Sequence, residues 1–417
     1  MMISTIWNIL LAFAAANDGC SAFLHSSINS ASAVRRDNIL PLHSSTQVTE
    51  PKSQPRSGIA QELLNLALKS PLWTYVMVPQ ARASIVKTAE SNGIQWMNAK
   101  SWLNEQLSTK DYSDVVYPDY YKQSFHAYQD GNLSYDAAVE QELASRAVGA
   151  RNFPKYGERG EDVFRDSFDK ALAGIGARIC DNPNEQGKKV IVDFGCGTGT
   201  STRRMASQYP EVDQLIGIDL SPYFVDVGNT LLTLAPNAIE NGSGWITSIT
   251  PDERIELRQG DMANTSLPSN SASVVNLSLV VHELPTSVAK QVVSEAYRIL
   301  QPGGQLWISE MDFESTAYKA QRENALLFSL LRATEPYLDE YADGMQELRE
   351  FIVDTFDSTK ITAATGRHYA LVAEKGLENN GDDDVDRVKR LEDYRFREDG
   401  SYAVEDTHLK PWESKDD

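Results

Sequence analysis

The sequence predicts an α/β protein in which helices cover both faces of a mostly parallel β-sheet. Short apolar runs of strand length alternate with helical patterns between residues 188 and 312, and this alternation is typical of βαβ units. Acidic side chains follow the first two runs, at Asp193 and Asp219. Glycines follow the first run at alternate positions, where the backbone can turn sharply and approach a ligand without a Cβ in the way.

Residues 188–222 carry the clearest signal. The apolar run 190–192 indicates a buried parallel strand that ends at Asp193. A helical pattern follows, and a second apolar strand, 215–218, ends in Asp219, an acid placed to accept two ribose hydroxyls. The glycines between the first strand and the helix are Gly195, Gly197 and Gly199. Together these features predict a nucleotide-binding βαβ unit.

The glycine spacing indicates which nucleotide is bound. The dinucleotide fingerprint is G-x-G-x-x-G, whereas this chain has D-x-G-x-G-x-G, starting at Asp193. The mismatch disfavours an NAD- or FAD-binding domain. The stretch resembles motif I of the class I S-adenosylmethionine (SAM)-dependent methyltransferases, and Asp219 lies where that family has its ribose-binding acid. The resemblance implies SAM as cofactor and a Rossmann-like, seven-stranded, mostly parallel sheet.

Two further strands complete the cofactor site that the resemblance implies. Residues 253–262 predict a third strand ending near Asp261, and residues 271–285 contain a fourth whose carboxyl end, 276–280, faces the methyl group. In the resembled family the acid after the third strand accepts from the adenine amino group, and the next residue packs on the ring. The expected cofactor-binding residues are Asp193, Gly195, Cys196, Gly197, Gly199, Asp219, Leu220, Asp261, Met262, Asn276 and Ser278.

The later part of the domain resembles small-molecule methyltransferases, particularly the quinone-biosynthesis C-methyltransferases. A helix from Pro285 to Leu300 leads through a Pro-Gly-Gly turn into an apolar strand, 305–312. Residues 317–352 are helical in pattern, and residues 356–375 predict a closing antiparallel hairpin with its turn near Gly366. The resemblance covers residues 188–375, the expected methyltransferase domain.

The preceding segment, 58–187, predicts a helical lid. Apolar residues recur at helical spacing over 59–68 and 81–107, and Ser134 is placed to cap a further helix. Aromatic residues gather between positions 116 and 128, and we expect one or two of them to line the site while the rest pack in the core. The residues expected to line the substrate site are Tyr120, Tyr121 and His126.

The expected chemistry is an in-line displacement at the sulfonium methyl, so alignment of the reactants matters most. A base is needed only if the acceptor holds its proton. His282 and Glu283, just after the fourth strand, are the candidate catalytic pair. The competing interpretation, which we favour from position alone, is that His282 starts a helix and bonds a backbone carbonyl; His126 is a weaker candidate base.

Motifs that are missing narrow the acceptor. The fourth strand ends in NLSL, residues 276–279, rather than the Asn/Asp-Pro-Pro-Tyr of amino-methylating DNA enzymes. No Pro-Cys nucleophile and no magnesium catechol site stand out there, so we expect no metal. A small-molecule or lipid-like acceptor remains. Alternatives are a catalytically silent methyltransferase-fold protein that binds or assembles partners, and a protein methyltransferase.

Composition adds limits on partners. The chain has 417 residues and a formal net charge of −20, which argues against a nucleic-acid partner. Its three cysteines form no disulfide framework or paired zinc-ligand spacing. Oligomeric state is left open, and no transmembrane segment is expected in the mature chain.

The two ends of the chain differ from its centre. Residues 1–57 combine a short apolar run with a Ser-rich, acid-poor stretch, which resembles the signal-plus-transit presequence of algae with secondary plastids. Ordinary secretion and a plain disordered tail are the alternatives. Residues 376–417 form an acidic tail whose first part is expected to be a solvated linker, while Tyr402, Leu409 and Trp412 are placed to dock on the body.

Overall fold

The computed structural model describes residues 78–126, 128–180, 187–234, 251–323, 328, 334–377 and 391–405. The proposed presequence, the helix expected over 59–68, and both Leu409 and Trp412 lie outside the described residues.

The centre of the molecule is an eight-stranded sheet in the order β3-β2-β1-β4-β5-β7-β6-β8. Strands β1 to β5 run parallel to one another, whereas β7 runs antiparallel to its two neighbours, β5 and β6. The strands are β1 Val190–Phe194, β2 Gln214–Asp219, β3 Ile255–Gln259, β4 Ala272–Ser278, β5 Leu300–Met311, β6 Ser358–Ala363, β7 His368–Glu374 and β8 Leu391–Asp393. The predicted mostly parallel sheet and its closing hairpin are confirmed, with the short strand β8 added beyond the expected seven.

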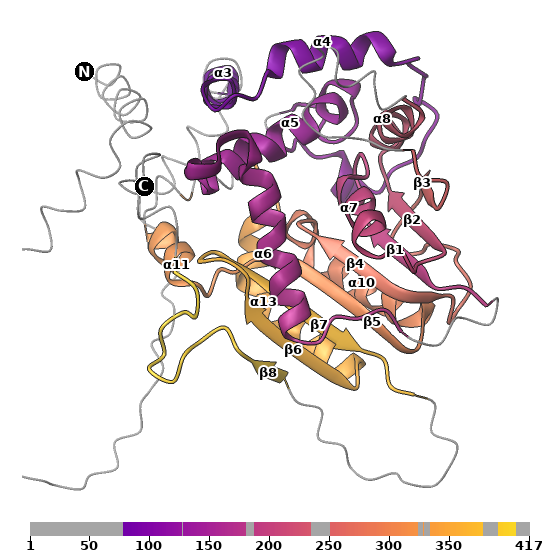
Figure 1. Ribbon diagram of the computed structural model, residues 1–417, viewed down its shortest axis with the longest axis vertical. Helices are drawn as coiled ribbons and strands as arrows, with labels where there is room; N and C mark the ends of the chain where they lie inside the picture. The colour runs from indigo at the N-terminus through magenta and orange to yellow at the C-terminus, as the bar shows by residue number, and fades with distance from the viewer. Residues whose placement is uncertain are drawn as a thin grey trace, which may run out of the picture. The chain divides into compact units, whose positions relative to one another are not determined.

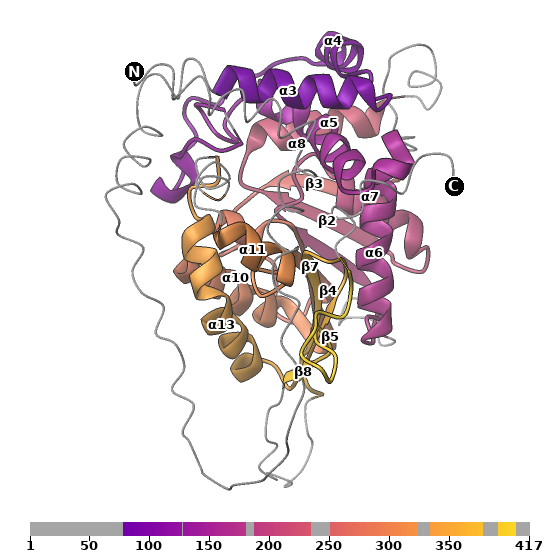
Figure 2. The same ribbon diagram turned by 90° about the vertical axis from the view of Figure 1, so that its left-hand side faces the viewer.

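Helices cover both faces of the sheet (Figures 1 and 2). Helices α10 (Thr286–Ile299) and α13 (Leu338–Thr355) pack on one face, and α6 (Gly160–Gly174) and α7 (Thr200–Gln208) on the other. In β1, Val190, Val192 and Phe194 join the first of these layers while Ile191 joins the second. This alternation is the two-residue period of a strand, and burial on both faces explains why β1 has an uninterrupted apolar run.

Helix α11 (Thr316–Glu323) and α13 lie at the two ends of the stretch 317–352 that was expected to be helical. The remaining helix of the domain, α8 (Pro222–Thr233), follows β2 and packs beside β3. Among the described helices, none combines the length and apolar character needed to cross a bilayer.

The N-terminal helices form a second apolar layer against α8. They are α3 (Val78–Ser91), α4 (Trp96–Gln106), α5 (Tyr135–Asn152) and the short helices η2 (Asp119–Lys122) and η3 (Pro154–Arg159), and Figures 1 and 2 show α3, α4 and α5 gathered at one end of the sheet. Trp96, Leu103 and Leu143 pack there with Phe224 and Leu231 of α8.

Local signals explain where α5 begins and how it turns into α6. Ser134 caps α5, its hydroxyl oxygen accepting a hydrogen bond from the Ala137 amide at 3.3 Å. Where α5 crosses α6, a Cβ on Gly149 would lie 2.3 Å from the Cα of Glu161, and a Cβ on Gly160 would lie 2.4 Å from the Gly149 carbonyl oxygen. The crossing therefore requires glycine on both helices, and it fixes the lid on the sheet.

The C-terminal segment, residues 391–405, is more ordered than a solvated tail. It contributes β8, parallel to β6, and buries Tyr402, whose hydroxyl donates to Asp312 at 2.8 Å. Arg395, only 3% exposed at its side chain, donates to both Asp312 oxygens and to Glu314. The predicted docking of Tyr402 is confirmed. The solvated linker was expected in the first part of the tail, where residues 378–390 lie outside the described residues.

Acid is expected to release this segment. Burial raises the pKa of Asp393 and Glu314, but the guanidinium groups of Arg395 and Arg349 outweigh it and hold both pKa values below the ordinary 3.8 and 4.5. The stabilisation is therefore complete at neutral pH and is lost as pH falls below about 4. Hydrogen exchange of residues 391–405 measured against pH should show this loss, and equal protection at pH 3 and pH 7 would contradict it.

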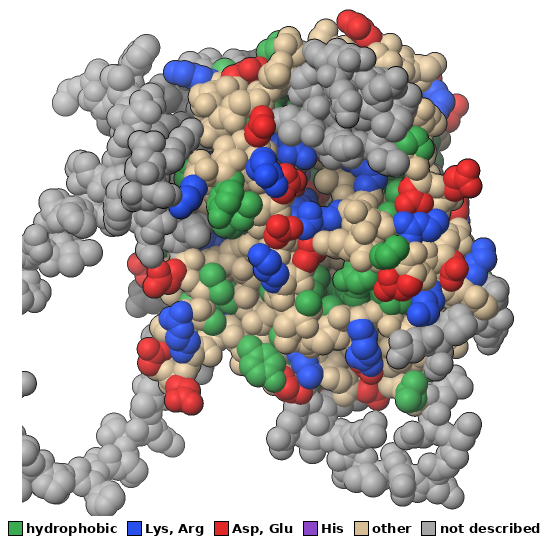
Figure 3. Space-filling model, in the orientation of Figure 1, with side chains coloured by type: hydrophobic (Ala, Val, Ile, Leu, Met, Phe, Trp, Pro, Cys, Tyr) green, Lys and Arg blue, Asp and Glu red, His purple; other side chains and the backbone are tan. Residues whose placement is uncertain are grey.

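The face of the molecule drawn in Figure 3 carries acidic and basic side chains interspersed, without a broad patch of one sign. The charges there are distributed as on an ordinary solvated surface.

Candidate active site

Asp193 and Asn276 form a buried brace between β1 and β4. The Asp193 carboxylate accepts hydrogen bonds from the hydroxyls of Ser201 and Thr202, both at 2.6 Å, and from the Asn276 side-chain amide at 2.8 Å. Asp193 is 1% exposed and Asn276 5% exposed. Both residues were expected to bind the cofactor, and the structure uses both to fix the start of α7 to the sheet.

The three glycines after Asp193 all adopt positive φ angles, 63° at Gly195, 55° at Gly197 and 84° at Gly199. Side-chain-bearing residues rarely adopt this conformation. A Cβ on Gly195 would also lie 2.5 Å from a methyl of Val280. The loop is thus shaped to bring its backbone close to the neighbouring strand end, with Gly199 directly before α7.

Asp219 at the end of β2 faces this loop. Its carboxylate accepts from the Gly197 amide at 2.9 Å, from the Ser221 amide at 2.8 Å and from the Tyr121 hydroxyl at 3.3 Å. Burial raises the pKa of Asp219 despite these donors. Leu220, next in the chain, is half-buried, and its carbonyl accepts from Gln259.

The third strand end brings Asp261 and Met262 to the same edge. Asp261 is half-buried and accepts from the Ala263 amide at 2.8 Å, and Met262 packs against the main apolar core. Tyr120 lies near Asp261; burial, followed by the Asp261 charge, raises its pKa to about 12. Tyr120 and Tyr121 therefore stand between the acids of the predicted cofactor site, as expected of site-lining residues.

Cys196 and Ser278 have different surroundings. Cys196 is buried, and its burial raises the thiol pKa well above the ordinary value, so the thiol stays protonated and acts in packing. Ser278 at the end of β4 accepts a hydrogen bond from Arg165 of α6 at 2.8 Å. Arg165, which the sequence gave no reason to single out, thereby ties the lid side of the molecule to the strand end.

His126, His282, Glu283 and Glu335 meet just beyond β4, and we refer to them as the His–Glu cluster. His126 Nε2 lies 3.0 Å from Oε1 of Glu335 and 3.7 Å from Oε1 of Glu283. His282 Nδ1 lies 2.8 Å from Oε1 of the fully buried Glu310. The cluster adjoins the cofactor site, because the charges of both Asp219 and Glu283 act on the Tyr121 hydroxyl.

The His–Glu cluster and the adjacent Glu310 together hold three carboxylates against two imidazoles. Burial acts to lower the pKa of each histidine, but Glu310 raises that of His282 to about 10 and Glu335 raises that of His126 to about 9. Burial raises the pKa of Glu283. The favoured interpretation of His282, a ring satisfied by a backbone carbonyl, is wrong, since Nδ1 of the ring pairs with the Glu310 carboxylate.

Sequence reasoning missed Glu310 and Glu335. Glu310 lies within an apolar strand, β5, and Glu335 precedes α13, so neither stands in a recognisable motif. A charged residue inside an otherwise apolar strand is the signal that could have found Glu310, because an unpaired carboxylate is rarely buried.

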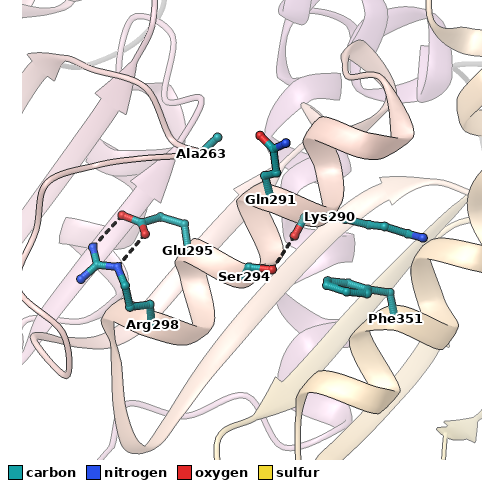
Figure 4. A pocket seen from close by; sticks show the side chains of 7 residues that line it. All are labelled: Ala263, Lys290, Gln291, Ser294, Glu295, Arg298 and Phe351. Atoms are coloured by element: carbon teal, nitrogen blue, oxygen red, sulfur yellow. Dashed lines mark hydrogen bonds and ion pairs between the residues drawn. The ribbon is translucent and has the colours of Figure 1, made fainter.

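An open hollow of about 420 Å³ lies on the outer side of α10, apart from these residues (Figure 4). Its lining includes Phe351, with Lys290 over the ring, and Glu295 and Arg298, which pair with each other. None of the predicted site residues lines it. Its charged groups are already compensated, so the hollow gives no reason to place the active site there.

The cofactor half of this site lies in a stretch of the chain that is similar to known proteins. A family model described as a methyltransferase domain matches residues 192–308. Arsenite methyltransferase of Halobacterium salinarum is 24% identical over 185 residues, which are 43% of this chain and 42% of that protein. Carboxy-S-adenosyl-L-methionine synthase of Hydrogenovibrio crunogenus is 28% identical over 196 residues, 46% of this chain and 68% of that protein.

Among solved structures, a SAM-dependent methyltransferase of Methanosarcina mazei is 15% identical and aligns with a TM-score of 0.33, covering 48% of this chain and 96% of its own. The match to the arsenite enzyme spans less than half of that protein's length. The family match coincides with the strands and loops that hold the glycines, Asp219 and Asp261. Residues 192–308 of this chain are therefore a methyltransferase domain, with SAM as its cofactor.

Proposed function

We propose that the protein transfers the methyl group of SAM to a small organic or lipid-like acceptor whose reactive atom lies against the His–Glu cluster. One observation carries the proposal. Tyr121 donates to Asp219 of the cofactor site and lies within the electrostatic reach of Glu283 in the cluster. The two sites therefore adjoin, as donor and acceptor must in an in-line displacement.

The reaction conserves atoms and electrons as follows. A lone pair on the acceptor forms a bond to the methyl carbon while the carbon–sulfur bond breaks, and that bonding pair stays on sulfur as S-adenosylhomocysteine leaves. A proton on the acceptor passes to a carboxylate of the cluster.

The chain's own residues divide the work between them. Asp219 accepts from the ribose hydroxyls, with the Gly197 and Ser221 amides holding its carboxylate in place. The glycine loop lets the backbone approach the cofactor. Tyr120 and Tyr121 cover the site from the lid, which excludes water and strengthens the electrostatic interactions inside.

Replacing Asp219 with asparagine is expected to weaken S-adenosylhomocysteine binding roughly 10- to 100-fold, because hydrogen bonds to a charged acceptor contribute about 1.5–3 kcal/mol. Calorimetric titration of the full chain measures the change. Asp213→Asn is the matched control, since Asp213 is an exposed aspartate whose side chain accepts a hydrogen bond from the Lys189 amide. Equal binding by wild type and Asp219→Asn, with both proteins folded, would refute the assigned site.

Methyl transfer itself is tested with SAM carrying a labelled methyl group. Incubation with fractionated small molecules and lipids, and separately with proteins, should place the label in the small-molecule fraction. Label in protein would favour the protein methyltransferase alternative. Cofactor binding without any transfer to the fractions would favour a binding or assembly protein.

We also propose a plastid as the protein's location, on the composition of residues 1–57 alone. A fluorescent protein fused behind these residues and expressed in an alga with a secondary plastid should enter the plastid. Appearance in the medium would support secretion instead.

A further inference from the structure

We propose that the His–Glu cluster binds a divalent metal ion, with His126, His282 and Glu283 as ligands and Glu335 as a fourth. The sequence predicted no metal site, because these residues come from separate segments and share no ligand spacing. Folding brings one ligating atom from each of the first three within 4.8 Å of the others. His126 Nε2 lies 3.0 Å from Glu335 and 3.7 Å from Glu283. These distances bracket the spacing of about 3.3 Å between ligands at bond lengths near 2.0–2.1 Å in a tetrahedral site.

Two of the proposed ligands, His282 and Glu283, are each held by a second group that leaves one of their ligating atoms available. Glu310 engages Nδ1 of His282, which leaves Nε2 of that ring for a ligand bond. Asn132 donates to Oε2 of Glu283 at 3.1 Å, while Oε1 of Glu283 faces His126. A carboxylate on the far nitrogen of a ligating histidine is the usual outer support of a protein metal site.

Glu335 supplies an independent observation. Its side chain is 10% exposed, and its Oε2 atom is buried without a hydrogen-bond partner in the described part of the chain. A buried carboxylate oxygen left without a partner is costly. A cation bound beside this carboxylate would remove that cost, and the other oxygen of Glu335 lies 3.0 Å from His126 Nε2.

The backbone at His126 supports the same interpretation. Its φ angle is +50°, a conformation that non-glycine residues adopt at a cost and that clusters at functional sites. The His126 amide donates to the Thr334 carbonyl at 2.9 Å, so the strained residue is fastened beside Glu335. The fold thus maintains an unfavourable turn that brings this imidazole to the carboxylates.

The ligand set indicates the kind of metal. Two imidazoles and two carboxylates suit Zn²⁺, Mn²⁺ or Fe²⁺, whereas a copper(I) site would call for thiolate or thioether ligands. The cysteines that the structure describes, Cys180 and Cys196, are both buried away from the cluster in packing positions. We take Zn²⁺ and Mn²⁺ as the probes.

The metal's role rests on the proposed function: it would polarise a hydroxyl or similar group of the acceptor, so that its proton leaves more readily before methyl transfer. Bound zinc lowers the pKa of water to about 7, which shows the size of the effect on an oxygen nucleophile. Binding of the metal itself does not depend on the methyl-transfer proposal.

The test begins with full-length protein stripped by a chelator and titrated calorimetrically with ZnCl₂ and with MnCl₂. We expect one equivalent of one of these ions to bind, and we expect His126→Ala and Glu335→Gln each to weaken that binding at least tenfold. The matched controls are His368→Gln, at a buried histidine outside the cluster, and Glu105→Gln, at an exposed glutamate on α4. Both controls should bind as wild type does.

Two further measurements separate the possible failures. Co²⁺ in place of Zn²⁺ should give a visible absorption band that the His126→Ala variant loses, and circular dichroism checks that each variant is folded. No metal binding, or equal binding by wild type and a folded His126→Ala/Glu335→Gln double variant, overturns the metal site. S-adenosylhomocysteine binding to the metal-free protein is measured in parallel, and its loss in Asp219→Asn alone would leave the cofactor assignment standing.

Discussion

Replacing Arg395 with alanine is expected to lower the free energy of unfolding by about 3–5 kcal/mol, the range for breaking a buried ion pair by removing one partner. Asp312 is completely buried and accepts from Arg395 and from Tyr402. Without the guanidinium, its charge would remain in the interior with neutral donors alone, the Tyr402 hydroxyl and the Glu314 amide. Burying an uncompensated carboxylate is one of the few changes with so large an effect.

Urea denaturation, followed by the midpoint and the slope, measures this change. Arg397→Ala is the matched control, because Arg397 is an exposed arginine of the same segment whose side chain donates to Ser401 and Ala403. We expect it to stay within about 0.5 kcal/mol of wild type. An Arg395→Ala variant as stable as the control would show that the C-terminal segment does not hold the sheet edge.

Replacing Glu310 with glutamine is expected to lower methyl transfer and metal affinity by roughly 10- to 100-fold, the usual cost of losing an outer support of a metal ligand. The Glu310 carboxylate accepts from the amides of Val281, His282 and Met311 and faces the His282 ring. A glutamine offers one oxygen to these donors and turns an NH₂ group toward the rest. The His282 ring then loses its fixed orientation.

The readouts distinguish positioning from a general loss of structure. S-adenosylhomocysteine affinity should be unchanged in Glu310→Gln, because no hydrogen bond joins Glu310 to Asp219 or to the glycine loop among the described residues. The loss of activity should appear in kcat. Glu374→Gln, at a half-buried glutamate near the other end of the neighbouring strand β7, should keep full activity. If activity falls only in proportion to the unfolded fraction, Glu310 has a structural role alone.

The cofactor half of the site was predictable because its determinants are local. Asp193, the three glycines and Asp219 lie within 27 consecutive positions, and a strand, a turn and a helix constrain their spacing directly. The family match over residues 192–308 confirms a methyltransferase domain with SAM as cofactor, while the roles of the individual residues stay predictions. The role of Asn276 was less predictable. Its position at a strand end does not show that its side-chain amide forms a hydrogen bond with the neighbouring strand.

The other half was not predictable for the opposite reason. His126, His282, Glu310 and Glu335 are separated by long stretches of chain, and only the packing of the lid on the sheet brings them together. The strand β8 escaped notice because its sequence, Leu-Glu-Asp, lacks the β-branched residues typical of strands. Its pairing depends on tertiary contacts, chiefly those of Arg395, that no local pattern records.

The hydrogen bond from Tyr121 to Asp219 has a consequence for the order of events. Tyr121 occupies an oxygen of Asp219 that a ribose hydroxyl would use, and it is five residues from His126 in the same short segment. We therefore expect the segment that carries Tyr121 and His126 to withdraw before the nucleotide enters. Steady-state kinetics should accordingly follow a compulsory sequence, with SAM as the leading substrate and its demethylated product the last to depart.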